Sequence, residues 1–198
     1  MSLVASQPEH GEPPRWKWTG DEVIRLGGLG VFPPDQRFEL LSGEIIQIMP
    51  PGARHAAIVS LIAELLRRAF GNGFHVWEEK PIRLDDYSDP QPDVAVVGGS
   101  SSDYLERFPG PVDILLLVEV AETTLAYDRG AKLTAYATAG IREYWMVNLR
   151  DNEVEVHRDP AEGRYLTRHI ATVGEELSPL AASHSALSVS VLLGQQVL

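Results

Sequence analysis

The residues best suited to chemistry in this sequence are two carboxylates that stand at or inside apolar runs. Asp93 directly precedes the run of residues 94–97, and Glu119 stands without a break in the run of residues 114–120. Unbroken apolar runs are typical of strands that are covered on both faces. A carboxylate in such a strand must be paired, protonated or bound to a metal, because an unpaired charge out of water is strongly unfavourable.

A lysine follows the Glu119 run at a spacing that can return it to the carboxylate. Asp128, Lys132 and Tyr136 are each four residues apart, so they share one face of a helix that Gly140 ends. A helix that directly follows the strand can lay the ammonium of Lys132 beside Glu119.

Two carboxylates on neighbouring strands form a hard, oxygen-rich site, which suits Mg²⁺ or Mn²⁺. A lysine beside them supplies positive charge without being a ligand. In phosphodiester hydrolysis the metal polarises the phosphate and lowers the pKa of a bound water, while the ammonium orients the nucleophile or stabilises transition-state charge. Asp93, Glu119 and Lys132 are therefore the main candidates, with Glu39 and His55 in support.

Other catalytic motifs are missing from the sequence. It contains no GxxxxGK[ST], no GxGxxG after a strand, no GxSxG and no HExxH, and its six histidines show no tight metal-ligand pair. It contains no cysteine, which excludes disulfides and zinc–thiolate sites and favours a reducing compartment.

The composition predicts one globular domain with a sizeable core, since 44% of the 198 residues are hydrophobic. The formal charge of −11 argues against a broad electropositive surface for nucleic acid. A local patch or bound divalent cations can still reverse the potential at one site. No apolar run approaches the ~18 residues of a membrane span, so we expect a soluble, cytoplasmic protein without a membrane partner.

Periodicity and turn residues predict the surrounding elements. We expect a flexible leader over residues 1–15 and a single domain over 16–198. The predicted helices cover residues 21–26 and 53–70, with a helical turn at 104–108. The predicted strands cover residues 37–41, 44–49, 74–78, 82–84, 94–97, 112–120, 143–149, 153–157 and 164–170, with a short strand or helix in the tail 186–198.

Four blocks of the chain resemble the bacterial Uma-two family of restriction endonucleases, within the PD-(D/E)XK nuclease superfamily. They are RFELLSGEIIQIMPPGARHAAI (37–58), PDVAVV (92–97), LLLVEV (115–120) and DRGAKLTAYATAGIREYWMV (128–147). The last block is the most specific, because D-x-x-x-K-x-x-x-Y followed by AGIREYW is hard to reach by chance.

The resemblance implies an α/β (α+β) fold of restriction-endonuclease type, with a mixed β-sheet flanked by helices and extra N-terminal and C-terminal hairpins. It also implies a divalent-metal nuclease site in which the lysine has moved from the strand to the following helix. Here Ala121 occupies the strand position two after Glu119, and Lys132 would be the migrated replacement. Relatives have a Ser-Pro-Ser-Thr-like turn after the strand acid, whereas this chain places an extra acid, Glu122, there.

Each candidate residue also has a purely structural alternative. Asp93 could cap a turn, Glu119 and Lys132 could form a buried structural ion pair, Glu39 could be a solvated hairpin residue, His55 could cap or pack the helix start, Tyr136 could be a core aromatic, and Asp128 could be an acid at a helix N-terminus.

We expect a metal-dependent phosphodiesterase acting on nucleic acid, with DNA as the expected substrate. Asp93 and Glu119 would bind Mg²⁺ or Mn²⁺, Lys132 would serve the attacking water, and Glu39 would complete the shell. The alternatives are a catalytically silent binding or assembly module and a metal-dependent hydrolase of small phosphate esters. Exposed sheet edges and an apolar tail favour a homodimer, whose two sites could cut both strands.

Overall fold

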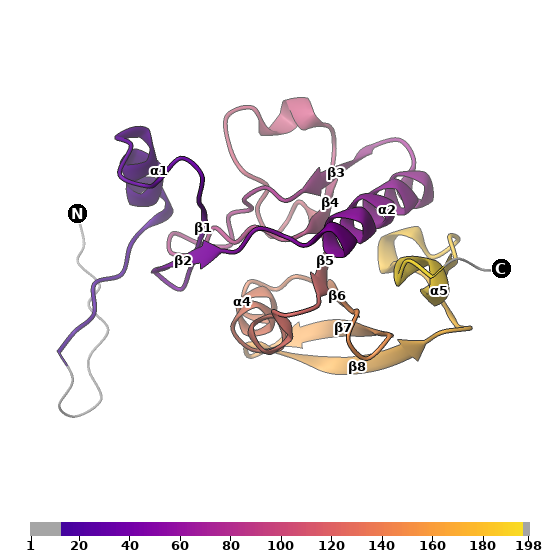
Figure 1. The fold of residues 1–198 in the computed structure, drawn as a ribbon. Helices are drawn as coiled ribbons and strands as arrows, with labels where there is room; N and C mark the ends of the chain where they lie inside the picture. The colour runs from indigo at the N-terminus through magenta and orange to yellow at the C-terminus, as the bar shows by residue number, and fades with distance from the viewer. Residues whose placement is uncertain (1–12, 196–198) are drawn as a thin grey trace.

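The computed structural model describes residues 13–195 of the chain, which fold into a sheet with helices on both faces (Figure 1). The leader predicted over residues 1–15 therefore falls mostly outside the described residues, and residues 13–15 have no regular structure. The helices are α1 (Gly20–Gly28), α2 (Ala53–Phe70), α3 (Leu125–Tyr127), α4 (Leu133–Thr138) and α5 (Val189–Leu192). The strands are β1 (Arg37–Leu41), β2 (Glu44–Ile48), β3 (Phe74–Glu78), β4 (Val94–Gly98), β5 (Ile114–Ala121), β6 (Glu143–Asn148), β7 (Glu153–Ala161), β8 (Arg164–Thr172), β9 (Glu176–Leu177) and β10 (Leu187–Ser188).

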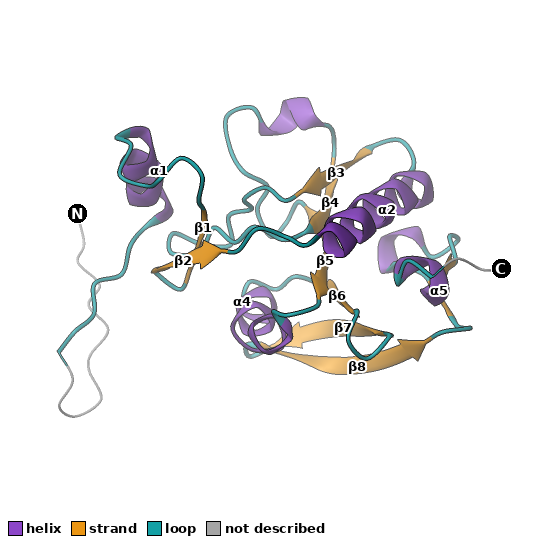
Figure 2. Cartoon of the chain, in the orientation of Figure 1, coloured by secondary structure: helices purple, strands orange, loops and turns teal. Residues whose placement is uncertain are grey.

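Six strands form the main sheet in the order β3-β4-β5-β6-β7-β8 (Figure 2). All neighbours are antiparallel except β5 and β6, which run parallel. A parallel pair needs a crossover connection, and the helical segment that contains α3 and α4 provides it. The mixed sheet flanked by helices confirms the predicted fold class.

The two faces of the sheet carry separate hydrophobic cores. On one face, α2 packs through Ile58, Ile62 and Leu66 against strand residues that include Val118 and Trp145. On the other face, α4 contributes Tyr136, which packs with Tyr144 and Met146 of β6. Coverage on both faces explains why β4 and β5 contain the apolar runs of residues 94–97 and 114–120.

The β1–β2 hairpin forms its own two-stranded sheet beside the main one. Ser42 and Gly43, which separate the two predicted strands, form its turn, and both residues have the positive φ values, 53° and 84°, that a type I′ hairpin turn requires. The hairpin docks on the loop before β4, because the N–H of Asp89 donates to the carbonyl of Leu40 at 2.9 Å and the N–H of Gly43 donates to that of Tyr87 at 2.8 Å. This docking brings β1 to the same end of the sheet as the start of β4.

Two predicted elements differ in the structure. Residues 82–84 form no strand, because the N–H groups of residues 82 and 84 donate across a tight turn to residues 90 and 88 while residue 83 donates to Pro109. Pro81 and Pro90 lack an N–H and interrupt any ladder at both ends. The helical turn predicted at 104–108 lies instead at Ser101–Tyr104, where Ser100 and Asp103 form a capping box.

The C-terminal region extends further than predicted. The hairpin predicted at 153–157 and 164–170 is longer and continues the main sheet through the β6–β7 pairing. The tail contains both β10 and α5, and its residues 196–198 lie outside the described range. Among the described helices, none combines the length and apolar character needed to cross a membrane.

Candidate active site

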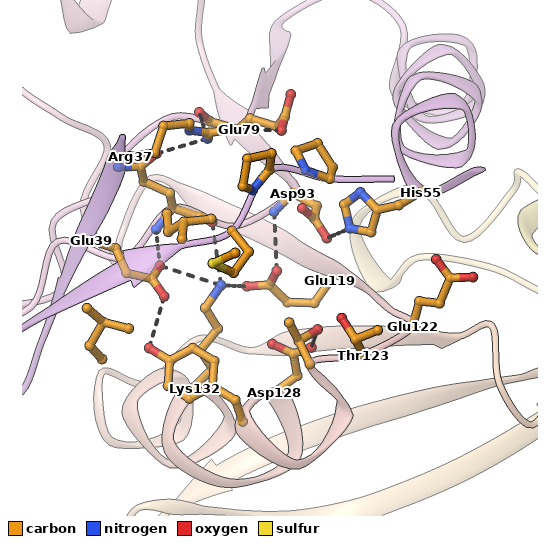
Figure 3. A pocket seen from close by; sticks show the side chains of 18 of the residues that line it. Arg37, Glu39, His55, Glu79, Asp93, Glu119, Glu122, Thr123, Asp128 and Lys132 are labelled. Carbon is orange, nitrogen blue, oxygen red and sulfur yellow. Dashed lines mark hydrogen bonds and ion pairs between the residues drawn. The ribbon is translucent and has the colours of Figure 1, made fainter. Parts of the chain in front are cut away.

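A pocket of about 330 Å³ opens between the β1–β2 hairpin, the start of α2 and the ends of β4 and β5 (Figure 3). Most of its charged side chains are acidic. The acids are Glu39, Glu79, Asp93, Glu119, Glu122 and Asp128, and the basic residues are Arg37, His55 and Lys132. The three main candidates and the two supporting residues predicted from the sequence all line this one pocket.

Asp93 and Glu119 come together through strand pairing. Val94 pairs with Val118 in the antiparallel β4–β5 ladder, which sets Asp93 beside Glu119. The N–H of Asp93 donates to Glu119 Oε2 at 3.3 Å, and Asp93 Oδ2 accepts the N–H of Val120 at 2.7 Å. The Asp93 carboxylate therefore bonds to the neighbouring strand rather than capping its own turn.

Glu119 is buried at the centre of this arrangement. Its Oε1 accepts hydrogen bonds from Lys132 Nζ at 2.8 Å and from the Tyr136 hydroxyl at 2.6 Å. Burial raises the pKa of Glu119 to about 8, although the positive charge of Lys132 opposes that rise. The negative charge of Asp93 adds to the increase.

Lys132 reaches Glu119 from a π-helical turn, Asp128–Lys132, between α3 and α4. The wider turn is closed by the N–H of Leu133, which donates to the carbonyl of Asp128. The lysine side chain is only 7% exposed. Burial alone would lower the pKa of Lys132, but the nearby carboxylates, Glu119 and Glu39 above all, outweigh burial and raise it. The ammonium therefore stays charged.

Glu39 is buried, so its interpretation as a solvated hairpin residue is wrong. Its Oε1 accepts the Tyr127 hydroxyl at 2.9 Å, and its Oε2 accepts the N–H of Gln91 at 2.9 Å. The same Oε2 lies 3.5 Å from Lys132 Nζ. The hairpin thus delivers a second carboxylate to the lysine.

Comparison with known proteins shows the family of this chain and supports its fold. A family model described as "Putative restriction endonuclease", Uma2, matches residues 21–191. The chain belongs to the Uma2 family. It is also similar in fold to a crystal structure described as a "putative nuclease belonging to DUF820" from Anabaena variabilis, with a TM-score of 0.68 and 18% identity over 89% of this chain and 97% of that one. No curated protein matches it.

His55 contributes to the site of this Uma2 protein through Asp93. Its Nε2 lies 3.2 Å from Asp93 Oδ2, and this hydrogen bond is the main reason that the pKa of His55 is raised. The alternative that His55 caps its helix is wrong, because no side chain forms a capping hydrogen bond at the start of α2 and Nε2 of His55 bonds to Asp93 instead.

Asp128 differs from its structural alternative, whereas Tyr136 matches its alternative and also contacts the site. Asp128 does not begin the helical segment, since α3 precedes it; it is buried and accepts the hydroxyl of Thr124 at 2.6 Å. Burial raises the pKa of Asp128, and the positive charge of Lys132 opposes this increase. Tyr136 is a core aromatic, as one interpretation held, yet its hydroxyl also bonds to Glu119.

Two site residues of this Uma2 protein were not predicted from the sequence. Tyr127 binds Glu39 through its hydroxyl, and its five-residue offset from Lys132 fits no α-helical face, so only a π turn brings the two together. Gln91 acts through its backbone N–H and carbonyl, which no side-chain pattern can reveal.

Arg129, which follows Asp128, points away from the pocket and donates to Glu155 at 2.7 Å.

Proposed function

We propose that this Uma2 protein is a nuclease that hydrolyses phosphodiester bonds of nucleic acid with Mg²⁺ or Mn²⁺, and that DNA is its substrate. Family membership supports a restriction-endonuclease-like nuclease. The observation that carries the finer proposal is the contact between Lys132 Nζ and Glu119 Oε1 at 2.8 Å, directly beside Asp93. A charged lysine next to two carboxylates suits phosphodiester hydrolysis, because the carboxylates can hold a metal ion while the ammonium stabilises transition-state charge.

Asp93 and Glu119 fit a small hard cation. Asp93 Oδ1 accepts no hydrogen bond from the described residues, and Glu119 Oε2 accepts one long bond at 3.3 Å. One oxygen of each carboxylate is thus open to a ligand. No three His, Cys, Asp or Glu side chains of residues 13–195 converge, so these two carboxylates would hold the ion together with retained waters and substrate phosphates, as proteins commonly hold Mg²⁺.

The bound ion would supply a water of lowered pKa and polarise the phosphate. The chain's own groups do the rest. Lys132 is no ligand, and its ammonium would stabilise charge that develops on the phosphate in the transition state. His55 would hold Asp93 in orientation through its bond to Oδ2.

The acidic pocket explains how substrate binding would depend on the ion. Six carboxylic acids and only two always-charged basic residues, Arg37 and Lys132, line the pocket. Such a site repels phosphates until a divalent cation reverses the local potential. The same argument applies to the whole chain, whose formal charge is −11. We also propose a homodimer, because cutting both strands of a duplex needs two sites.

Cleavage assays on four substrates test the proposal. Plasmid DNA, single-stranded DNA, RNA and bis(p-nitrophenyl) phosphate would each be incubated with Mg²⁺, with Mn²⁺ and with EDTA. We expect metal-dependent cleavage of DNA by the wild type and none by Asp93→Asn. The exposed Asp35→Asn serves as the matched control and should cut normally.

The other outcomes decide between the alternatives. Turnover of the chromogenic diester without cleavage of any nucleic acid would favour a hydrolase of small phosphate esters. Metal-independent binding of DNA without cleavage would favour a silent binding module. Cleavage that persists in Asp93→Asn would remove that residue from the site.

A further inference from the structure

We infer that Glu39, fixed in place by Tyr127, is a second anchor for the Lys132 ammonium, and that it holds the lysine when Glu119 turns its charge to a metal ion. The metal part of this inference rests on the proposed function. It assigns Glu39 a role other than metal ligand and makes Tyr127 a positioning residue.

The Lys132 ammonium lies between two carboxylates from different parts of the fold. It is 2.8 Å from Glu119 Oε1 on β5 and 3.5 Å from Glu39 Oε2 on β1. The carbonyl of Gln91 lies 3.5 Å away, and the ring of Tyr127 covers the ammonium at 5.8 Å. Figure 3 shows Lys132 pointing between Glu39 and Glu119. The short contact belongs to Glu119 and the longer one to Glu39, so one anchor dominates in this state.

A metal bound by Glu119 would weaken that dominant contact. The carboxylate has one negative charge to share, and its Oε1 already accepts a second donor, the Tyr136 hydroxyl, at 2.6 Å. A divalent ion and an ammonium on the same carboxylate also repel each other. Without another partner, Lys132 would be left as a buried charge with a weakened counter-ion, which is costly.

Glu39 can serve as the counter-ion of Lys132 in place of Glu119, because hydrogen bonds hold both of its carboxylate oxygens. The Tyr127 hydroxyl holds Oε1 at 2.9 Å, and the N–H of Gln91 holds Oε2 at 2.9 Å. The side chain is only 2% exposed. Two neutral donors fix the geometry of Glu39 but leave its full charge for Lys132, which is the arrangement that a standing counter-ion needs.

Tyr127 acts on the lysine through Glu39 rather than on the substrate. Its hydroxyl bonds to the carboxylate, and its ring lies against the ammonium. Burial and the charge of Glu39 raise the pKa of Tyr127, so the hydroxyl keeps its proton and remains a donor. Removal of this hydroxyl alone should loosen Glu39 without changing the charges of the site.

Lysine-selective NMR can follow the anchor without any activity. The chain has three lysines, Lys17, Lys80 and Lys132, so ¹⁵N-lysine labelling gives three side-chain signals. A buried, bonded ammonium exchanges its protons slowly and stays visible. Glu119→Gln imitates the loss of the first anchor's charge without metal. We expect the Lys132 signal to persist in Glu119→Gln and to broaden at least threefold in Glu119→Gln/Tyr127→Phe.

The double variant Glu119→Gln/Glu39→Gln, which has no carboxylate at either anchor, should lose the protected signal altogether. Should that variant not fold, the comparison of Glu119→Gln with Glu119→Gln/Tyr127→Phe still decides the question, because these two variants carry the same charges. Loss of the signal in Glu119→Gln alone would overturn the inference, as would equal line widths in Glu119→Gln with and without the Tyr127 hydroxyl. None of these outcomes depends on cleavage or metal binding, so they are separate from a failure of the proposed function.

Kinetics supply a second readout. Tyr127→Phe should lower kcat about tenfold with little change in KM or in Mg²⁺ affinity, because the lysine it positions acts on the transition state. The matched control is Tyr165→Phe, because the buried Tyr165 hydroxyl has no hydrogen-bond partner in the described part of the chain. The kcat of this control variant should be unchanged. A tenfold loss of Mg²⁺ affinity in Glu39→Gln would instead make Glu39 a ligand and overturn the inference.

Discussion

The hydroxyl of Tyr136 donates to Glu119 Oε1 at 2.6 Å, the same oxygen that the ammonium of Lys132 contacts at 2.8 Å. Both donors lie on the helical segment after β5, four residues apart, so one helix face holds one carboxylate oxygen. The other oxygen, Oε2, bonds only to the N–H of Asp93 among the described residues. Glu119 is thereby oriented with one oxygen fixed by the helix and the other directed toward β4.

Replacement of Glu119 by glutamine should leave the metal-free protein as stable as the wild type or more stable. Burial raises the pKa of Glu119 to about 8, so ionisation of this carboxyl costs more free energy in the folded state than in the unfolded state. An acid whose folded pKa is raised contributes stability that is complete below its unfolded pKa of about 4.5 and is lost as pH rises toward 8. In chemical denaturation at pH 5 and pH 8, the free energy of unfolding of the variant relative to the wild type should be higher at pH 8 than at pH 5.

The buried ion-pair interpretation makes the opposite prediction for the same variant. If the charge of Glu119 serves only to pair with Lys132, Glu119→Gln should lose about 3–5 kcal/mol of stability at pH 8. Glu64→Gln, an exposed substitution on α2, is the matched control and should change stability by less than about 0.5 kcal/mol.

Divalent metal should stabilise the wild type through Asp93. Its carboxylate and that of Glu119 repel each other, and an ion between them would relieve the repulsion. At a 100-fold excess over Kd, binding adds about 2.7 kcal/mol, which should raise Tm by about 5 °C or more. Differential scanning fluorimetry with Mn²⁺ should show this shift in the wild type and in Asp35→Asn, but not in Asp93→Ala. An equal shift in Asp93→Ala would exclude Asp93 as a ligand.

The sequence was enough to predict the helix face but not the turn that forms it. The spacing predicted that Lys132 lies beside Glu119 and that Tyr136 shares its helix face; the structure confirms the first contact and shows that the Tyr136 hydroxyl also bonds to Glu119. The π turn at Asp128–Lys132 has no local signature, because it depends on the fit of the segment against the sheet, where the hydroxyl of Tyr144 reaches the carbonyl of Asp128 at 3.5 Å. Tyr127 could not be assigned to the site without it.

The β1–β2 hairpin shows the same limit at longer range. Its two strands were predicted from local residue types and are confirmed, and Ser42 and Gly43 form the two-residue turn between them. Its position over the site depends on contacts distant in sequence, such as Arg37 with Glu79 at 3.0 Å. No periodicity encodes such contacts, so Glu39 could be taken for a solvated residue although it is buried.

A separate ionic cluster should make the protein sensitive to acid. Glu155 on β7 is buried and accepts bonds from Arg129 at 2.7 Å and Arg168 at 2.9 Å. Burial alone would raise the pKa of Glu155, but His157, whose Nε2 lies 3.4 Å from Glu155 Oε2, and the hydrogen bonds from the two arginines outweigh burial and lower the pKa to about 2. A lowered folded pKa gives stability that is present above about pH 4.5 and lost as pH falls toward 2.

The substitution Glu155→Gln should therefore destabilise the protein at pH 7 by about 3 kcal/mol, the lower end of the cost of breaking a buried ion pair, because both arginines are partly exposed. Chemical denaturation at pH 7 and pH 3 measures the effect, and the difference in the free energy of unfolding between wild type and variant should be smaller at pH 3. A gap of the same size at both values would mean that packing, not charge, stabilises this position.

The last prediction compares the two basic residues of the π turn. Lys132 points into the pocket, whereas Arg129, three residues earlier, pairs with Glu155 and Glu153 on β7. Lys132→Met keeps the apolar stem and removes the charge, so it should lower kcat by a factor of about 10² or more, the effect of deleting one electrostatic stabiliser. Mg²⁺ affinity should change little, because the lysine is no ligand. Arg129→Met should cost stability but keep kcat, and Lys80→Met, at an exposed site, should keep both. Steady-state cleavage with calorimetric Mg²⁺ titration checks all three variants; full turnover by Lys132→Met together with loss of turnover in Arg129→Met would transfer the catalytic role to the arginine.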